Sequence, residues 1–307
     1  MRKPRLVIFG ARGLAGKAIL EALYPSYSSN WEIIAPTSHE VDLHDWHSTK
    51  DFLMSKRPEL LINAAARVGG ISFNEKNQIN QALYNSRISL NLLEASDAVQ
   101  IPNLISISSS CVYPSNAIRP YKEEDLYSGK GESTNEGYSI AKMLAIRFIE
   151  MKFNHDKKNW VNLIATNLFG INDKYNVNGH LVGSAIQRLR LGIVNNQKEL
   201  VFRGTGNAIR EFMFSKDLGD SVKFLIENEV AYPTFNVTNG ESKTVKQILQ
   251  LLCGILNFPG EVFFTGDITQ DGNPDKRLDS SRLMNMGWRP KYSFEIGLRE
   301  LIKNTSV

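Results

Sequence analysis

The sequence predicts an α/β protein with a Rossmann-type, doubly wound parallel sheet and a smaller α/β lobe. Two observations predict this fold. Short apolar runs rich in β-branched residues alternate with helical patterns over the first half of the chain, which is typical of βαβ units. The chain also has 307 residues, more than one core usually covers, so a second lobe is expected.

The first half of the chain supplies the elements of the sheet in order. Strands are predicted at 6–9, 31–35, 60–63, 104–107 and 160–165. Helices are predicted from Leu14 to Leu23 and over 49–55, 78–96 and 135–153. The strand over 160–165 is almost continuously apolar, as expected when both faces of a sheet are covered.

After Asn167 the pattern becomes irregular because several glycines interrupt it, and the βαβ rhythm returns only over 215–227 and 234–237. A second lobe is expected to begin here. We assign 1–167 plus 209–238 to a dinucleotide-binding domain. We assign 168–208 plus 239–307 to the smaller lobe, closely joined to the larger one.

Composition excludes several classes of protein. With 42% hydrophobic residues and a net charge of +4, the chain is an ordinary globular protein, too weakly basic to indicate nucleic-acid binding. No stretch approaches the ~20 apolar residues of a membrane span, and the start of the chain has no apolar region typical of a signal peptide. The two cysteines predict neither a metal site nor a disulfide framework. We therefore expect a cytoplasmic protein.

A glycine-rich turn follows the first strand and opens the first helix. Its residues are Gly10, Ala11, Arg12, Gly13, Leu14, Ala15 and Gly16. Glycine lets the backbone turn sharply and approach a pyrophosphate closely, while the helix N-terminus offers free N–H groups. The spacing is GxxGxxG and not GxGxxG, so a turn kept only for packing is the alternative. Because the glycine-rich turn lies between a strand and a helix, it predicts a dinucleotide site.

The residues around this turn favour NADP over NAD. An NAD site usually places an acid about 20 residues after the turn, at the end of the second strand. Residues 36–39 carry no carboxylate there. Arg12 lies inside the glycine turn, where a guanidinium suits a 2′-phosphate, although a solvated turn residue is the alternative.

Tyr138 and Lys142 lie four residues apart on the predicted helix over 135–153, so their side chains share one face. A nearby ammonium lowers the pKa of a phenol and makes it a usable acid. Such pairs are also common on helix surfaces. Serines at 108–110 favour the chemical interpretation, because they end the fourth strand at the carboxyl edge where doubly wound sheets bind ligands.

Longer motifs carry a resemblance to a known family. They are GxRGLxG at 10–16, AAARVGGI at 64–71, SSCVYP at 109–114, TNE at 134–136 before Tyr138 and Lys142, TNL at 166–168, GTG at 204–206, REF at 210–212 and DGNP at 271–274. On these motifs the sequence resembles the extended short-chain dehydrogenase/reductase family and, within it, the GDP-L-fucose synthase branch. The resemblance covers nearly the whole chain.

The resemblance implies NADPH-dependent 3,5-epimerisation and 4-reduction of a GDP-4-keto-6-deoxy sugar. It assigns Cys111 as the base and His180 as the acid of epimerisation, and their reference pKa values suit proton transfer near neutral pH. Tyr138 then donates a proton during reduction, Lys142 tunes it and binds the nicotinamide ribose, and Ser109 holds the keto oxygen. Read without the family, Cys111 is a small buried hydrophobe and His180 a solvated loop residue.

The resemblance also implies the binding residues. For NADP they are the seven residues of the glycine turn with Ser38, Leu43, Ala64, Ala65, Lys142, Ala165, Asn167, Leu168 and His180. For the GDP-linked sugar they are Arg188, Arg203, Arg210, Asp271 and Lys276 in the smaller lobe. A solvated helix face or turn is the alternative for these side chains. Relatives commonly form homodimers through a four-helix contact that includes the helix of Tyr138.

Departures from the branch leave the substrate open. They are Arg203 in place of tryptophan, Ala165 and Ser133 in place of proline, Asp275 in place of arginine, and Ser38 in place of an arginine that would favour NADP. A GDP-4-keto-3,6-dideoxy sugar or a GDP-4-keto-heptose is an alternative substrate. An NAD-retaining epimerase or dehydratase is less favoured, because the related dehydratases have Thr-Asp-Glu at 109–111. A non-catalytic sensor commonly lacks the Tyr138 and Lys142 pair.

Overall fold

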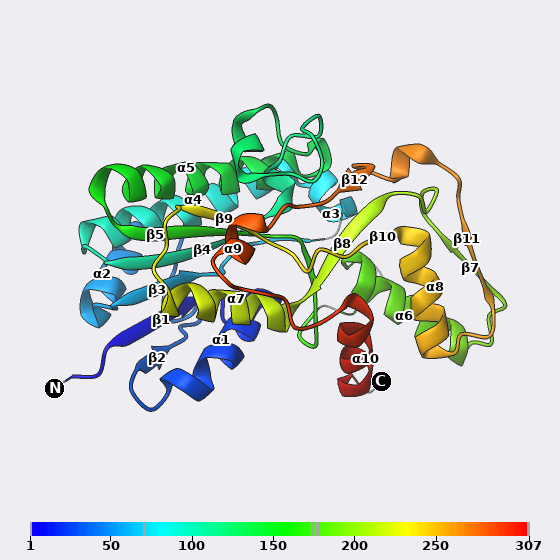
Figure 1. The fold of residues 1–307 in the computed structure, drawn as a ribbon, viewed down its shortest axis with the longest axis horizontal. Helices are drawn as coiled ribbons and strands as arrows, with labels where there is room; N and C mark the ends of the chain where they lie inside the picture. The colour runs from blue at the N-terminus through cyan, green and yellow to red at the C-terminus, as the bar shows by residue number, and fades with distance from the viewer. Residues whose placement is uncertain (1, 70, 174, 176–178, 306–307) are drawn as a thin grey trace.

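In the computed structural model the described residues are 2–69, 71–173, 175 and 179–305. A central sheet carries helices on both faces, and a smaller group of strands and helices lies beyond one end of it (Figure 1). The predicted α/β class with a doubly wound parallel sheet is confirmed. Within these residues no helix combines the length and the apolar character needed to cross a bilayer.

Six parallel strands form the central sheet. They are β1 (Arg5–Phe9), β2 (Glu32–Ile34), β3 (Leu60–Asn63), β4 (Asn103–Ser109), β5 (Asn159–Ala165) and β9 (Thr234–Val237). Their order is β2-β1-β3-β4-β5-β9, so the chain leaves β1 in one direction along the sheet and returns to its other side at β3. Such a switch point, at the carboxyl ends of the strands, is where sheets of this kind bind ligands.

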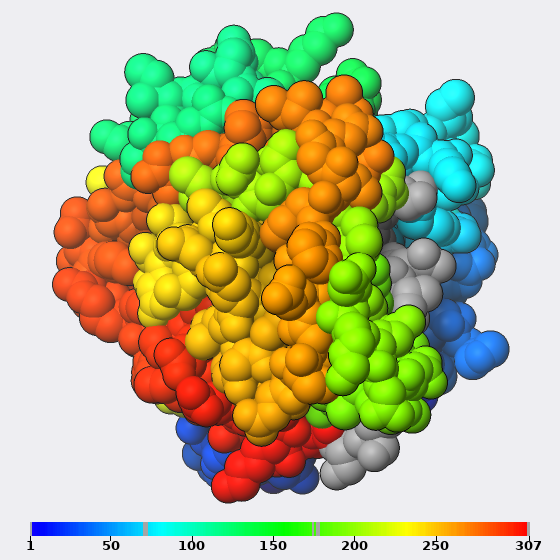
Figure 2. Space-filling view, turned by 90° about the vertical axis from the view of Figure 1, so that its right-hand side faces the viewer, coloured from blue at the N-terminus to red at the C-terminus, as the bar shows by residue number. Residues whose placement is uncertain are grey.

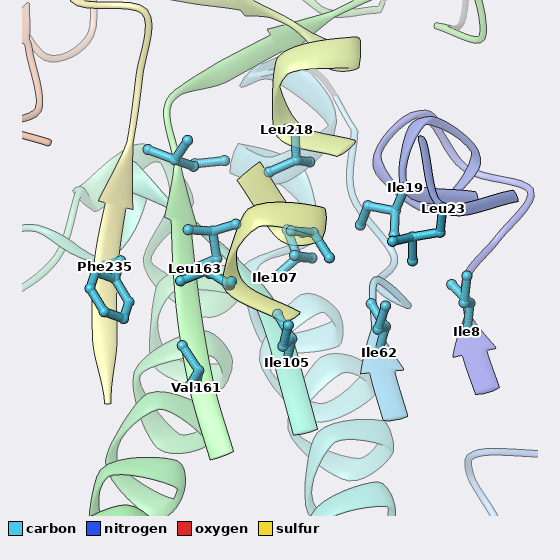
Figure 3. Packing of buried hydrophobic residues seen from close by; sticks show 14 of the residues in the cluster. Ile8, Ile19, Leu23, Ile62, Ile105, Ile107, Val161, Leu163, Leu218 and Phe235 are labelled. Carbon is cyan, nitrogen blue, oxygen red and sulfur yellow. The ribbon is translucent and has the colours of Figure 1, made fainter. Parts of the chain in front are cut away.

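Five long helices cover the two faces of this sheet (Figure 1). On one face lie α1 (Leu14–Tyr27) and α7 (Ser215–Glu227), and on the other lie α2 (Trp46–Lys56), α4 (Gln78–Ala98) and α5 (Glu136–Asp156). The short α3 (Ile71–Lys76) precedes α4, and α9 (Ser281–Asn285) packs near β9. Apolar side chains alternate between the faces: Leu6 and Ile8 of β1 pack toward α1, whereas Val7 packs toward α2 and α4. Figure 3 shows the first cluster, in which Ile62, Ile105 and Leu163 continue that layer across the sheet.

The smaller lobe has its own sheets and core. Its elements are β6 (Asn167–Phe169), α6 (Leu181–Val194), β7 (Glu199–Phe202), β8 (Ile209–Phe214), β10 (Ser242–Thr244), α8 (Val245–Leu256), β11 (Glu261–Phe264), β12 (Asp275–Lys276) and α10 (Phe294–Asn304). Strand β8 pairs with β6, β10 and β12, and β7 pairs with β11. A separate buried cluster joins α6, α8 and α10. Figure 2 looks onto this lobe, with the yellow-to-orange residues of α8 and β11 in the middle.

Sequence patterns predicted the larger lobe well and the smaller one poorly. The strands at 60–63 and 234–237 and the helix at 215–227 have the predicted bounds. The predicted irregularity after Asn167 is wrong, because α6, α8 and α10 are regular helices whose buried side chains recur on one face. The lobe boundaries stay a prediction. Strand β8, which we assigned to the larger lobe, is hydrogen bonded to strands of the smaller lobe.

Candidate active site

A cavity of about 1110 Å³ lies where the carboxyl ends of the central strands meet the smaller lobe. The larger lobe contributes the glycine turn, the segments after β3 and β5, the end of β4 and the start of α5. The smaller lobe contributes α6, β7, β8 and the segment before β12. Pockets for one drug-sized ligand measure roughly 300–1,000 Å³. The volume therefore suits a dinucleotide together with a second ligand.

Most of the predicted site residues line this cavity. They are Arg12, Gly13, Leu14, Ala15, Ala64, Ser109, Tyr138, Lys142, Ala165, Asn167, Leu168, His180, Arg188, Arg203, Arg210 and Asp271. The others are absent from the lining: Gly10, Ala11, Gly16, Ser38, Leu43, Ala65, Cys111 and Lys276. Gly70, part of the AAARVGGI motif, lies outside the described residues. The structure thus gathers residues from both lobes around one space.

The glycine turn has the geometry of a phosphate cradle. Gly10 has φ +78°, and a Cβ on it would lie 2.6 Å from the backbone of Ala64, which directly follows the neighbouring strand β3. A Cβ on Gly16 would lie 2.2 Å from the Gly10 carbonyl oxygen. Both positions therefore need glycine. Helix α1 begins after Gly13 with no side-chain cap, which leaves its first N–H groups directed at the cavity end of the turn.

The turn after β2 carries an acid just beyond the segment 36–39. The Glu40 side chain accepts a 2.8 Å hydrogen bond from the Thr37 backbone N–H. That hydrogen bond, together with the positive charges of Arg12 and Lys56, lowers the pKa of Glu40. Arg12 lines the cavity and Glu40 does not. The cavity lining at this end thus carries the guanidinium, and the acid lies outside it.

Helix α5 places Tyr138 and Lys142 on one face, as their spacing predicts, and that face lies against the end of β4. Both are buried, and the Lys142 ammonium donates a 2.8 Å hydrogen bond to the Ile107 carbonyl. The ammonium lies 5.7 Å from the centre of the Tyr138 ring. Burial lowers the pKa of Lys142 to about 8 and raises the pKa of Tyr138. The expected lowering of the tyrosine pKa is therefore wrong for this structure, because burial and the neighbouring Cys111 both raise it.

Three serines end β4 in different surroundings. Ser109 is half-buried and lines the cavity, and Ser108 lines it as well. Ser110 begins the 3₁₀ turn η1 (Ser110–Val112), so strand alternation stops before it. The hydroxyls of Ser108 and Ser110 are buried with no hydrogen-bond partner among the described residues. Ser109 is thus the more exposed hydroxyl of the cavity wall.

Cys111 lies in the layer behind this wall. It sits in η1, only 3% of its surface is exposed, and it is a free thiol. Burial raises its pKa, while the charge of Lys276 and a hydrogen bond from the Ser109 hydroxyl act against that increase. The thiol is therefore in contact with the cavity wall through Ser109 and is not itself part of the lining.

The opposite wall of the cavity carries the basic residues of the smaller lobe. His180 is the exposed N-cap residue of α6. On the same helix, the Arg188 guanidinium stacks 4.0 Å from the Phe202 ring and donates to the Val201 carbonyl at 2.5 Å. Burial lowers the pKa of the Arg188 side chain. This guanidinium is held in place before any ligand binds.

Asp271 and its neighbours form a prebuilt loop on that wall. The Asp271 carboxylate accepts hydrogen bonds from the Thr205 backbone N–H at 2.7 Å and from its hydroxyl at 2.5 Å. Arg210 donates to the Asp271 carbonyl at 2.7 Å, and Arg203 donates to the Gln270 side chain at 3.3 Å. Both carboxylate oxygens of Asp271 thus have partners within the protein, and the residue positions Thr205.

Sequence reasoning missed further polar residues at the site. Thr134 and Arg67 line the cavity, and the Thr134 hydroxyl is buried without a hydrogen-bond partner among the described residues. Both fall in motifs that carry the family resemblance, so position in a motif was the available signal. Glu132 is buried behind Thr134 and forms an ion pair with Lys276. No local pattern marks that pair, because its members are 144 residues apart.

Comparison with known proteins gives a consistent result. Residues 6–238 match the model of the NAD dependent epimerase/dehydratase family. The chain is 32% identical over 295 residues to a GDP-L-fucose synthase of Sinorhizobium fredii, which covers 96% of this chain and 93% of that protein. It is 31% identical over 297 residues to a GDP-L-colitose synthase of Yersinia pseudotuberculosis, covering 96% and 95%.

The fold is also similar to that of a solved structure. A GDP-6-OMe-4-keto-L-xylo-heptose reductase from Campylobacter jejuni superimposes with a TM-score of 0.88. The match covers 99% of this chain and 98% of that one at 21% identity. At this identity the likeness establishes the shared fold.

Proposed function

The chain belongs to the NAD dependent epimerase/dehydratase family, and we propose that it catalyses NADPH-dependent 3,5-epimerisation and 4-reduction of a GDP-4-keto-6-deoxy sugar. The product is GDP-L-fucose or a close analogue. One observation carries the proposal: a single cavity joins Ser109, Tyr138 and Lys142 to a basic wall in the smaller lobe. The names of the full-length relatives support the GDP-sugar class.

The glycine turn fits a nicotinamide dinucleotide. Gly10 and Gly16 leave no room for side chains, so that backbone and the free N–H groups of α1 surround the space for a pyrophosphate. We propose NADP as the form bound, because Arg12 lines the cavity at this turn and suits a 2′-phosphate. When bound, the cofactor supplies the hydride that reduces C4.

Tyr138 and Ser109 serve the reduction in this proposal. Both residues line the cavity, and the helix of Tyr138 packs against the strand that Ser109 ends, so we assign both hydroxyls to the C4 oxygen of the ketone. The Tyr138 hydroxyl donates the proton that balances the negative charge developing on this oxygen. Lys142 holds its ammonium against the strand end and supplies the nearby positive charge.

Cys111 and His180 serve the epimerisation. The ketone acidifies the hydrogens at C3 and C5, so that a base removes each proton and an acid returns one to the opposite face. His180 approaches from the smaller lobe and Cys111 from behind Ser109, so the two groups lie on different walls. The Ser109 hydroxyl, which donates to the sulfur, must move aside for a substrate proton to reach the thiolate.

The smaller lobe supplies the diphosphate clamp. Arg188 and Arg210 line the cavity with guanidiniums held by backbone carbonyls, and neither forms an ion pair within the described part of the chain. Guanidiniums bind phosphate oxygens through charge-assisted hydrogen bonds. Arg203, at the tryptophan position of the branch, adds a third positive charge to this wall.

A closely related substrate is the second candidate. One full-length relative is named GDP-L-colitose synthase, which favours a GDP-4-keto-3,6-dideoxy sugar as the alternative. The departures at Arg203 and Asp275 lie on the side of the smaller lobe, where the sugar nucleotide is expected.

We also propose a homodimer. Helices α4 and α5 pack side by side and leave large apolar side chains exposed on their outer faces (Figure 1). These side chains are Leu83, Leu90, Ile140, Leu144 and Met151. Such a patch on a globular protein is typical of an interface, and a second copy of the same pair of helices is complementary to it.

A panel of GDP-4-keto sugars tests the function. The purified protein is incubated with each sugar and NADPH in deuterium oxide, and cofactor oxidation and label at C3 and C5 are followed. We expect NADPH oxidation and label at both positions with the 6-deoxy sugar. Label at C5 alone with the 3,6-dideoxy sugar as preferred substrate would favour the second candidate. Turnover without NADPH consumption would overturn both in favour of an NAD-retaining epimerase.

A further inference from the structure

A buried ion pair lies beside Cys111 and outside the cavity lining. Lys276 on β12 donates a 2.6 Å hydrogen bond to the Glu132 carboxylate, and both side chains are less than 10% exposed. Replacing such a pair with apolar residues often leaves stability unchanged or raises it, so a pair of this kind is weak evidence of a purely structural role. Its position relative to the thiol suggests a different role.

The backbone ties this pair to the residue that carries the thiol. The Glu132 N–H donates a 3.2 Å hydrogen bond to the Cys111 carbonyl. A Cβ on the preceding Gly131 would lie 3.1 Å from that carbonyl and 2.0 Å from the Ser139 hydroxyl, so the loop passes directly against the 3₁₀ turn η1. Glu132 and Cys111 are therefore fixed relative to one another.

Amide side chains fix the orientation of the Glu132 carboxylate. Asn135 donates to it at 3.3 Å, and the Asn135 carbonyl accepts from Asn74 at 2.5 Å. Gln81 of α4 then donates to Asn74 at 3.0 Å. This chain of hydrogen bonds connects the pair to the helix layer behind the sheet and restricts its movement.

We propose that Lys276 and Glu132 form a charge-balancing pair that positions Cys111 for proton abstraction, with Lys276 stabilising the thiolate and Glu132 restraining Lys276. The inference rests on the proposed function for its role in epimerisation. Lys276 then acts as a positioning residue, whereas the resemblance assigned it to the substrate.

The charges around the Cys111 thiol determine in which direction each substitution shifts its pKa. The groups that interact with the thiol are Tyr138 and Lys142 of α5, Ser109 of β4, and Lys276 with Glu132. Burial raises the pKa of Cys111; Lys276 lowers it and Glu132 raises it. For Glu132 itself, burial is outweighed by Lys276, which lowers its pKa to about 2. The two members of the pair thus act on the thiol with opposite sign.

Titration of the thiol tests the proposal without any substrate. Thiolate absorbance near 240 nm is followed against pH in a Cys253→Ala background, with Cys111→Ser in the same background subtracted to remove tyrosine ionisation. We expect Lys276→Met to raise the pKa of Cys111 and to reduce the thiolate fraction at neutral pH about tenfold. Glu132→Gln is expected to lower the pKa, and Lys276→Arg to restore the wild-type titration.

The proposal would be overturned if the pKa of Cys111 shifted in the same direction in Lys276→Met and Glu132→Gln, or in neither. A purely structural pair gives no reason for the two variants to shift this pKa in opposite directions. If Lys276→Met does not fold, the comparison of Glu132→Gln with Lys276→Arg still tests it, as only the former should change the titration. With substrate, the pH profile of deuterium exchange should shift in the same directions. Titrations that shift as expected while no GDP-4-keto sugar exchanges would leave the pair supported and overturn the proposed function.

Discussion

The two walls of the cavity hold their functional groups in different ways. On the larger lobe, Tyr138 and Lys142 are buried. Burial raises the pKa of the tyrosine and lowers the pKa of the lysine, so the neutral form of each is favoured. On the smaller lobe, Arg188 and Arg210 are fixed by hydrogen bonds to carbonyl oxygens, and Asp271 binds its own loop. The first wall therefore holds its proton-carrying groups away from solvent, and the second is preorganised for binding an anion.

The largest effect should come from the wall of the larger lobe. We expect Tyr138→Phe to lower the rate of NADPH oxidation about 10²- to 10⁴-fold, because the variant lacks the proton donor for the C4 oxygen. Deuterium exchange at C3 and C5 should persist, since it depends on Cys111 and His180. Stopped-flow absorbance of NADPH and mass spectrometry of the recovered sugar measure the two steps separately.

Two further variants act as controls for this prediction. Tyr24→Phe changes an exposed tyrosine on α1 and should leave both steps unchanged. Cys111→Ser should show the reverse pattern, with exchange lost and NADPH affinity retained. Hydride transfer at the wild-type rate in Tyr138→Phe would remove this residue from the mechanism.

The difference between the walls also explains what sequence reasoning achieved. Tyr138 and Lys142 belong to one helix, and the serines end one strand, so helix spacing together with the position of the serines predicted one site at a sheet edge. The direction of the tyrosine pKa shift was missed because it depends on burial by the whole fold. Burial of that kind has no local signature in the sequence.

The smaller lobe was harder to predict for a related reason. Its main sheet is assembled from β6, β8, β10 and β12, which are far apart along the chain. The pairing of Glu132 with Lys276 depends on that assembly, as does the contact between Thr205 and Asp271. Family motifs identified some of these positions, but only the folded chain shows which residues pair with one another.

On the smaller lobe, Arg188→Ala should weaken binding more than it slows chemistry. We expect KM for the GDP-sugar to rise about 10- to 100-fold, the range for losing hydrogen bonds to a charged group, with a much smaller change in kcat. Steady-state kinetics under saturating NADPH measures both constants. This split would sharpen the assignment of this wall to binding.

Arg190→Ala is the matched control on the same helix. The Arg190 guanidinium donates to the Thr305 carbonyl at 2.6 Å and is not among the residues that line the cavity. It should leave KM unchanged. A fall in kcat alone in Arg188→Ala would instead place this guanidinium in the chemical step and remove the distinction between the walls.

The smallest effect concerns Glu211, at the seam between the walls. Its buried carboxylate accepts from the Thr238 hydroxyl at 2.9 Å and from the Leu278 N–H at 3.0 Å. Burial raises its pKa to about 7, above the ordinary 4.5, despite those hydrogen bonds. The folded state thus binds a proton that the unfolded state releases, so this stabilisation is full below pH 4.5 and is lost as the pH rises through 7.

Glu211→Gln should remove this pH dependence. We expect the free energy of unfolding of the variant, minus that of the wild type, to be about 2 kcal/mol higher at pH 8 than at pH 5, because only the wild type loses stability over this range. Urea denaturation at both pH values measures the difference, with Glu261→Gln at an exposed position of β11 as control. If the difference in free energy of unfolding between variant and wild type did not change with pH, Glu211 would be ionised throughout this range. The region between the two walls, like the wall of Arg188 and Arg210, would then be held by a charged group and not by a neutral carboxyl group.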